Sequence, residues 1–327
     1  MPGFRGAYTA GSTNWLSDDA ELTGASDLDI MIVLADGSQA CPRDKFIYRD
    51  TLLEASHLRS DQFQSPDRIL SDYHVAPSFR TTKIMFDPFG HLTPLLAAVS
   101  RDYHKRHWVR QRRNDAREKI LGYLRSIHEG AALHEQVMAL LFAAGITTHV
   151  LLVAGLGNPT VRARYVAVRE LLTDYDLLEF HETLLELLGA ARISPGQANH
   201  HLATLAEVFD AARRAIKTPF PFGSDISDNA RPIAIDGSLE LIARGYHREA
   251  MFWIGVTHSR CQTVLSRDAP GDLMRSFHES FQELAGDLGM GTFGEIRGRG
   301  AEIERMLPQL CDLAESIIAA NGEIEDD

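Results

Sequence analysis

The stretch that most constrains the fold is Asp27-Leu28-Asp29 together with the apolar residues 30–34 that follow it. This run is short, rich in aliphatic side chains and bounded by polar residues, which predicts a strand buried on both faces. Side chains alternate along a strand, so Asp27 and Asp29 are expected to point the same way. Two neighbouring carboxylates repel each other unless a cation lies between them. The pattern therefore indicates a divalent-metal site with oxygen ligands.

Two further features belong to this prediction. The Gly11-Ser12 pair lies upstream, and a glycine beside a small hydroxyl allows the backbone to approach phosphates closely. A third acid is expected from residues 45–58, which form one strand or two. If they form one strand, the side chains on one face are Phe46, Tyr48, Asp50, Leu52 and Glu54. Both acids are candidates, and Glu54 is preferred because it directly follows two leucines.

Gly-Ser followed by Asp-Leu-Asp at the start of an apolar strand resembles the DNA polymerase β-type nucleotidyltransferase superfamily, most of all its aminoglycoside nucleotidyltransferase branch. The resemblance covers roughly the first hundred residues well and the rest in outline. It implies an α+β fold, with a small mixed-sheet catalytic domain at residues 1–105 and a larger all-α domain at residues 106–327. In this family a helix usually precedes the Gly-Ser strand, whereas the present sequence begins about where that strand should start.

The resemblance also implies a reaction. A nucleoside monophosphate would pass from ATP to an acceptor hydroxyl, with release of pyrophosphate. Mg²⁺ would be held by Asp27, Asp29 and Glu54, and Glu54 would also act as the base. The contacts to the leaving phosphates would come from Gly11, Ser12 and Thr13. The helical domain would bind the acceptor in a cleft between the domains.

Apolar residues recur every two residues before Thr93 and about every 3.6 residues after it. Before this point we expect a helical stretch at residues 61–73 and a strand at residues 79–87 that ends in an Asp-Pro-Phe-Gly turn. The acidic tail at residues 322–327 is expected to fray. The helices expected after Thr93 lie near 94–128, 131–153, 160–173, 176–189, 196–216, 236–264, 271–288 and 301–321.

The composition is that of an ordinary globular protein, with 44% hydrophobic and 24% charged residues, and the length suggests two domains. No apolar run is judged long enough to span a membrane, and residues 137–155 are interpreted as a core helix. Three widely spaced cysteines argue against both a zinc site and a disulfide framework. These features indicate a cytoplasmic protein.

The net charge is −12, and most of the excess acid lies after residue 110. This balance makes nucleic acid an unlikely partner, because phosphates need a basic surface. It is compatible with a polycationic acceptor such as an aminoglycoside. One basic stripe lies on a predicted helix, and we expect it to be a solvated face paired with Asp102, Asp115 or Glu118 rather than a triphosphate contact. The stripe consists of Arg106, Arg110, Arg113 and Arg117.

Several alternatives stay open. Such an enzyme has three alternative classes of acceptor: a protein side chain, a nucleic-acid end or a metabolite. A catalytically idle module that senses nucleotide or binds a partner is a second class of function. Glu249 and Trp253 are candidate cleft residues, although a core position is favoured for Trp253 and a surface position for Glu249. The Gly-x-Gly-x-x-Gly match at residues 289–294 follows a helical pattern rather than a strand, which argues against a dinucleotide site. The oligomeric state is open.

Overall fold

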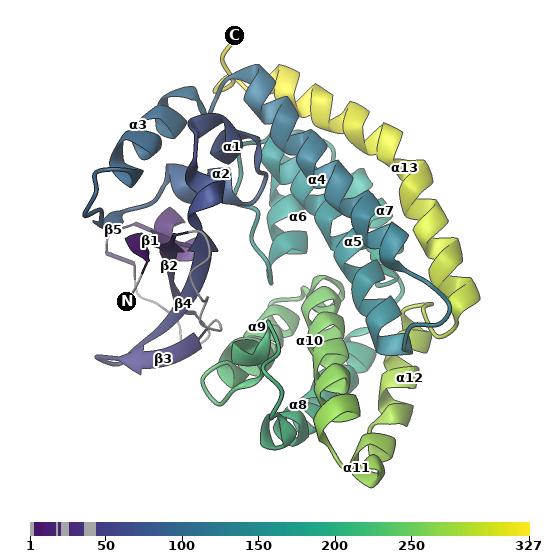
Figure 1. Ribbon diagram of the computed structural model, residues 1–327. Helices are drawn as coiled ribbons and strands as arrows, with labels where there is room; N and C mark the ends of the chain where they lie inside the picture. Colours follow the sequence, from purple (N-terminus) through teal and green to yellow (C-terminus); the bar gives the residue numbers. More distant parts are fainter. Residues whose placement is uncertain (1–2, 18, 21–25, 36–43) are drawn as a thin grey trace.

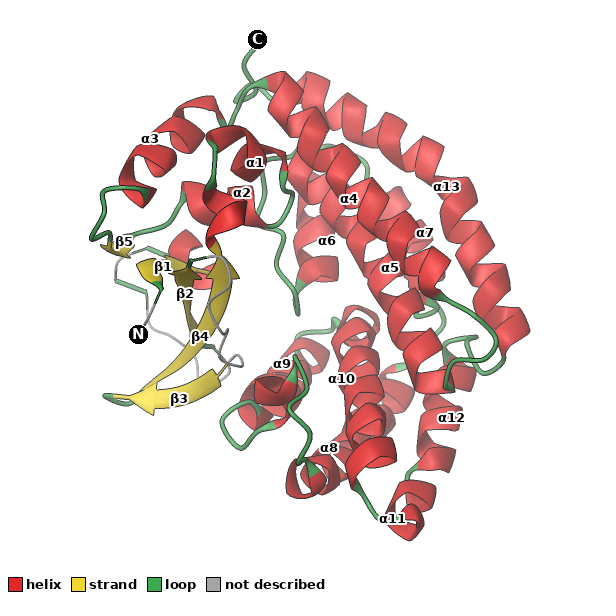
Figure 2. Cartoon of the chain, viewed as in Figure 1, coloured by secondary structure: helices red, strands yellow, loops and turns green. Residues whose placement is uncertain are grey.

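The structure is a computed structural model that describes residues 3–17, 19–20, 26–35 and 44–327. Strands gather in the N-terminal part of the chain, and helices make up the rest (Figures 1 and 2). Among the described residues, a mixed sheet of five strands is followed by a larger region of about ten helices. The predicted α+β fold class is therefore confirmed.

The sheet has the strand order β3-β4-β2-β1-β5. Strands β2 and β4 run parallel, and the other neighbouring pairs are antiparallel. The strand bounds are β1 (Phe4–Ala10), β2 (Leu28–Leu34), β3 (Asp44–Tyr48), β4 (Thr51–Arg59) and β5 (Ile84–Phe86).

The strand predicted after the two aspartates is β2, but its burial was predicted wrongly. Only Val33 and Leu34 are buried, whereas residues 28–32 are half-buried. The carboxylates at this end need water or a cation, so an apolar layer cannot seal it without a large desolvation cost.

One face of the sheet carries an aromatic cluster. The ring of Tyr8, on β1, packs edge-on against Phe63 and Phe79, with centroid distances of 5.8 and 5.1 Å. These two rings come from the short 3-10 helix η2 (Ser60–Phe63) and from α2 (Val75–Arg80), with α1 (Pro66–Ser71) between them. Tyr8 and Ala10 lie two residues apart on β1 and share this face. The cluster therefore lies beside the C-terminal end of β1.

The prediction of a strand at residues 79–87 was wrong for the first half of this segment. Phe79 lies in α2, which begins where the backbone N–H of Val75 donates to Asp72 Oδ1 at 2.9 Å. Only the last part of the predicted strand forms β5. The turn predicted after it is present, with Gly90 at a φ of 63°. Asp87 in this turn also accepts hydrogen bonds from the N–H and hydroxyl of Thr93, both at 2.8 Å, which tie it to the first turn of the next helix, α3.

The helices after Thr93 are more numerous than predicted, and the last one, predicted at 301–321, begins earlier, at Phe293. The predicted helix at 94–128 is two helices, and so are those at 236–264 and 271–288. Gly245, at a φ of 90°, separates the second pair. The bounds are α3 (Leu92–Asp102), α4 (Arg106–Ser126), α5 (Leu133–Ala154), α6 (Arg164–Asp174), α7 (Glu179–Leu188), α8 (Pro195–Ala215), α9 (Gly237–Ala243), α10 (His247–Asp268), α11 (Gly271–Ser276), α12 (His278–Asp287) and α13 (Phe293–Ala320).

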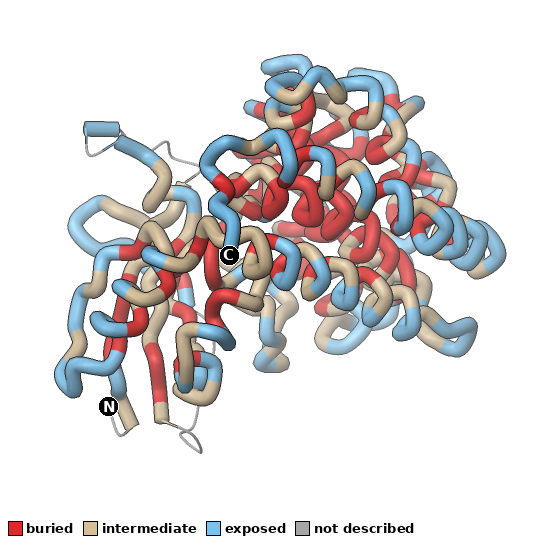
Figure 3. Tube along the Cα trace, turned by 90° about the horizontal axis from the view of Figure 1, so that it is seen from above, coloured by how far each residue is buried: buried red, intermediate tan, exposed pale blue. Residues whose placement is uncertain are grey.

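Helix α5 is the core of the helical region. By length and composition it could cross a membrane, so the prediction that no run is long enough was too strict. However, 83% of its apolar window is buried inside the protein, as the buried centre of the helical region in Figure 3 shows. The interpretation of this segment as a core helix is confirmed.

The basic stripe of α4 is partly exposed, and most of its residues pair with the C-terminal end of the chain. Arg110 and Arg113 both bind the carboxylate of Glu315 on α13, each through an N–O contact of 2.9 Å. Arg106 binds Asp326 at 2.9 Å. Only Arg117 makes a predicted pair, with Glu118 at 2.8 Å.

The acidic tail is held in place rather than frayed as predicted. The N–H of Glu325 donates to the carbonyl of His104 at 3.0 Å, and its carbonyl accepts from the N–H of Arg106 at 2.9 Å. Ile324 is buried. This two-sided backbone pairing fixes the tail beside the start of α4.

Candidate metal centre

Four residues form one row across the sheet: Ala10 pairs with Asp29, Asp29 with Glu54, and Glu54 with Lys45. Directly paired residues on neighbouring strands present their side chains on the same face. The row therefore collects two acids and a lysine on the face that carries the aromatic cluster. Asp27 precedes β2 by one residue and adds a third carboxylate at the edge of this row.

The three predicted metal ligands meet. One carboxylate oxygen from each of Asp27, Asp29 and Glu54 lies within 4.8 Å of the other two. Glu54 is buried, and the two aspartates are half-buried. An all-oxygen set of this kind suits a hard divalent cation such as Mg²⁺ or Mn²⁺, so these residues fit the metal that the sequence predicts. The arrangement alone does not identify the ion.

Asp50, the rival third acid, lies elsewhere. It forms the two-residue turn between β3 and β4 with Arg49, at positive φ values of 62° and 48° respectively, and it is exposed. The turn also overturns the single face predicted for residues 46–54, because Phe46 pairs with Leu53 and not with Glu54. A tight turn reverses the chain, so alternation cannot be counted through it.

Gly11 lies directly against the acids. Its φ is 77°, and a Cβ added there would lie 1.8 Å from Asp29 Oδ2. Only glycine allows this approach in this conformation. Its N–H points to the Ser78 hydroxyl, at 3.4 Å. Ser12 and Thr13 follow in a short 3-10 turn, where Ser12 is exposed and the Thr13 hydroxyl donates to the carbonyl of Ala10 at 3.4 Å.

Lys45 is a site residue that the sequence analysis missed. Its ammonium contacts both Asp27 and Glu54, and its side chain is only 4% exposed. Burial would lower the pKa of Lys45, but the carboxylates of Glu54 and Asp27 outweigh burial and raise this pKa above its usual value. The lysine therefore stays protonated and places a positive charge among the proposed metal ligands.

The helical region reaches the site through the segment between α8 and α9. Asp225, in the 3-10 turn η3 (Gly223–Ile226), places Oδ1 4.0 Å from the ammonium of Lys45 and Oδ2 2.9 Å from Arg260 of α10. Asn229 donates its side-chain N–H to the carbonyl of Lys45 at 2.8 Å. Burial lowers the pKa of Arg162, which precedes α6, and the charges of Glu240 and Asp27 partly offset this effect. These contacts join the sheet to the helical region.

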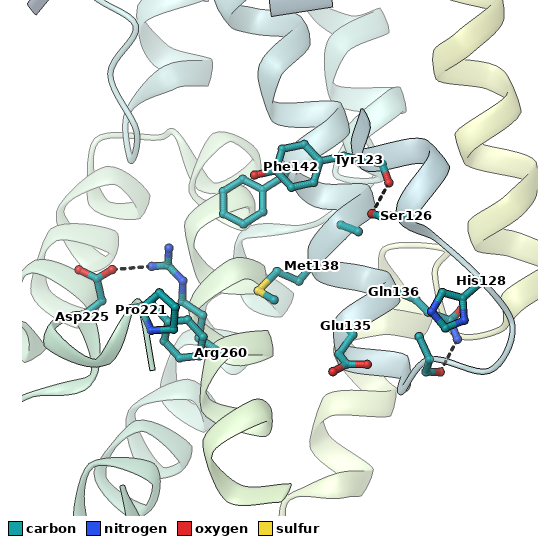
Figure 4. A pocket seen from close by; sticks show the side chains of 13 residues that line it. Tyr123, Ser126, His128, Glu135, Gln136, Met138, Phe142, Pro221, Asp225 and Arg260 are labelled. Atoms are coloured by element: carbon teal, nitrogen blue, oxygen red, sulfur yellow. Dashed lines mark hydrogen bonds and ion pairs between the residues drawn. The ribbon is translucent and has the colours of Figure 1, made fainter. Parts of the chain in front are cut away.

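A pocket opens on the helical side of this junction (Figure 4). Its volume is about 540 Å³, and both Asp225 and Arg260 line it. Figure 4 shows this ion pair on one side and Glu135 on the other. The rings of Tyr123 and Phe142, stacked with centroids 5.3 Å apart, form part of its wall. Acids and aromatic faces therefore line a cavity that shares Asp225 with the surroundings of Lys45.

The other cleft candidates belong to the helical core. Glu249 is buried and binds Arg169 at 3.3 Å, with His181 at 3.8 Å. Trp253 is also buried. Residues 289–294 form the connection between α12 and α13 and the first residues of α13, so no strand precedes the glycine motif. Trp253 is a core residue, as expected, whereas the expectation of a surface position for Glu249 was wrong, because Arg169 and His181 neutralise its buried carboxylate.

Neither the scan against protein-family models nor the search of curated proteins finds a match for this chain. The described residues therefore supply the grounds for a functional assignment. These are a mixed sheet, an acidic triad that could hold a metal ion, and a pocket lined by Asp225, which lies 4.0 Å from Lys45.

Proposed function

We propose that this protein is a Mg²⁺-dependent nucleotidyltransferase that moves a nucleoside monophosphate from ATP to a hydroxyl of a small, amine-bearing acceptor. The observation that carries the proposal is the convergence of Asp27, Asp29 and Glu54 on one sheet face, with Gly11 packed against Asp29. When bound, Mg²⁺ would neutralise the charge on the triphosphate.

The residues of this chain have separate roles in the proposed reaction. Asp27 and Asp29 hold the metal, and Gly11, Ser12 and Thr13 lie where the backbone can approach the triphosphate. Glu54 accepts the proton of the attacking hydroxyl, because it is the buried member of the triad and shares a row with Asp29. Arg162 and Lys45 add positive charge near the acids, which favours the binding of a polyanionic nucleotide.

The pocket in the helical region is the proposed acceptor site. Ammonium groups are recognised by carboxylates and by aromatic faces, and this pocket presents Glu135, Asp225 and the Tyr123–Phe142 stack. A polycationic sugar, as in an aminoglycoside, has this chemistry. A nucleic-acid end is disfavoured because phosphates would meet these acids.

The test measures pyrophosphate release with ATP and Mg²⁺ across a panel of polyols with and without amino groups. Calorimetric titration of ATP with and without Mg²⁺ accompanies it. Asp29→Asn should abolish both turnover and metal-dependent ATP binding with little loss of stability. Asp50→Asn, an exposed carboxylate in the adjacent turn, is the matched control and should behave like wild type. If Asp29→Asn kept full activity, the metal site would be wrongly assigned.

A catalytically idle, nucleotide-sensing module is the rival function. It predicts ATP binding without pyrophosphate release with any acceptor. The inward position of the Glu54 carboxylate favours the enzyme, because an idle site has no need to keep three acids together.

A further inference from the structure

The ammonium of Lys45 contacts two of the three proposed metal ligands and lies near a third carboxylate outside the triad. We propose that Lys45 is a tethered cation that pairs with Asp27 and Glu54 in the metal-free protein and moves to Asp225 when a divalent ion binds. This inference rests on the metal site of the proposed function. Lys45 is thus a positioning residue that links the metal site to the helical region.

Lys45 is well placed to hold the empty site together. Three carboxylates in a half-buried cluster repel one another, and one ammonium between two of them relieves part of that repulsion. The triad carries −3 and Lys45 carries +1, which leaves −2. One divalent cation matches this remainder, so the lysine and one ion together neutralise the triad.

The ammonium of Lys45 and a divalent ion compete for the same carboxylate oxygens of Asp27 and Glu54. A metal that takes the contacting oxygens of Asp27 and Glu54 places a double positive charge beside the ammonium of Lys45, which is then repelled. The side chain is buried, so its charge cannot simply move into water and needs another carboxylate.

Asp225 is that carboxylate. Its Oδ1 lies 4.0 Å from the ammonium, so a small rotation of the lysine side chain would complete the pair. Arg260 binds the other oxygen, Oδ2, at 2.9 Å and holds Asp225 in position. The backbone of Lys45 is meanwhile fixed by its pairing with Glu54 and by Asn229 at 2.8 Å. Only the flexible end of the lysine needs to move.

The transfer would couple two sites. Asp225 also lines the proposed acceptor pocket, so an ion at the triad would change the partner of a pocket residue. By thermodynamic linkage, an acceptor that binds Asp225 would then change the affinity for the ion by the same factor.

The test is calorimetric titration of Mn²⁺ alone into the nucleotide-free protein, with thermal unfolding measured in parallel with Mn²⁺ and with a chelator. Lys45→Met removes the ammonium and retains the length of the side chain. It should bind Mn²⁺ at least about tenfold more tightly than wild type, because the ion no longer displaces a cation. The same variant should melt lower in chelator and gain more from Mn²⁺. Lys119→Met, an exposed lysine on α4, is the matched control.

A double-mutant cycle separates this role from general packing. Asp225→Asn should weaken Mn²⁺ binding about threefold to tenfold, because the displaced ammonium loses its second partner. The double variant should bind Mn²⁺ like Lys45→Met alone, because Asp225 has no role once the ammonium is gone. If Lys45→Met does not fold, the Mn²⁺ affinity of Asp225→Asn relative to wild type decides whether the proposal holds.

The outcomes distinguish this inference from the proposed function. Equal Mn²⁺ affinity in wild type, Lys45→Met and Asp225→Asn would overturn the role of Lys45 and leave the metal-dependent enzyme standing. Absence of Mn²⁺ binding in every variant would overturn both.

Discussion

Gly11 and Asp29 lie so close that a methyl group on the glycine would overlap the Asp29 carboxylate, at 1.8 Å from Oδ2. The glycine also has a φ of 77°, which other residues adopt at a cost. Gly11 directly follows β1, whose last residue, Ala10, pairs with Asp29 on β2. The end of β1 and the start of β2 therefore form one structural unit.

Gly11→Ala should displace the Asp29 carboxylate and abolish metal-dependent ATP binding. The stability loss should be about 1–3 kcal/mol from the strained backbone and the overlap. Gly90→Ala is a matched control, because Gly90 has a φ of 63° with no atom within 4 Å of its added Cβ. It should lose some stability and keep ATP binding. Similar binding losses in both variants would mean that strain alone, rather than the contact with Asp29, explains the effect.

Glu54→Gln should abolish pyrophosphate release, whereas Asp50→Asn should leave it within about twofold of wild type. The reason is position, because Glu54 is buried in the triad and Asp50 lies in an exposed turn. Initial rates with saturating ATP and acceptor measure the difference. A loss of activity in Asp50→Asn with Glu54→Gln active would reverse the assignment of the third acid.

Acidification should unfold the helical region in part through His258. Burial, helped by the charge of His201, lowers the pKa of His258 to about 3. The unfolded histidine titrates near 6.5, so the unfolded state binds the extra proton between these values. The stabilisation is fully present above pH 6.5 and decreases by about 1.4 kcal/mol per pH unit as the pH falls toward 3.

The check is urea unfolding between pH 4 and 7. His258→Phe retains a ring next to Phe281. It should reduce the pH dependence of the free energy of unfolding by about 1.4 kcal/mol per pH unit, the contribution of one proton. An unchanged slope in His258→Phe would show that this histidine is not buried in its neutral form.

Arg112 should be a stability residue at the junction of the two regions. Its buried guanidinium donates to the carbonyls of Leu70 and Tyr103, at 3.2 and 2.7 Å, and lies 4.0 Å from the Tyr103 ring centroid. Arg112→Met leaves these carbonyls without that donor. It should lower the free energy of unfolding, measured with urea, by about 2 kcal/mol. Arg112→Lys should not restore the loss, because one ammonium lacks the fork geometry.

Arg117→Met is the comparison for Arg112. Arg117 lies on the same helix and pairs with its neighbour Glu118 near the surface, so its loss should change stability by less than about 0.5 kcal/mol. Equal effects of the two substitutions would contradict the structural role of Arg112.

The parts of the site that were predicted correctly follow from local patterns. The alternation of side chains across Asp27, Leu28 and Asp29 is a property of any strand, so two acids on one side required no knowledge of the fold. Glu54 was preferred over Asp50 on its apolar neighbours, and its place in β4 agrees. The change of periodicity after Thr93 likewise located the helical region.

The residues that were missed depend on contacts that local patterns do not encode. Lys45 faces Glu54 only because Arg49 and Asp50 form a tight turn with positive φ, and this dipeptide is not a strong turn signal. Asp225 comes from a turn-rich segment 180 residues beyond Lys45 in the chain. Its approach follows from how the helices pack, which the spacing of apolar residues does not determine.

The pairing of Glu325 with His104 and Arg106 brings the end of the chain back to the start of α4. The same two helices are joined a second time, because Glu315 on α13 binds Arg110 and Arg113 on α4. The first and last helices of the helical region are thus fastened to each other by both backbone and side-chain contacts. We therefore expect α4 and α13 to open together as one cooperative unit in amide hydrogen exchange.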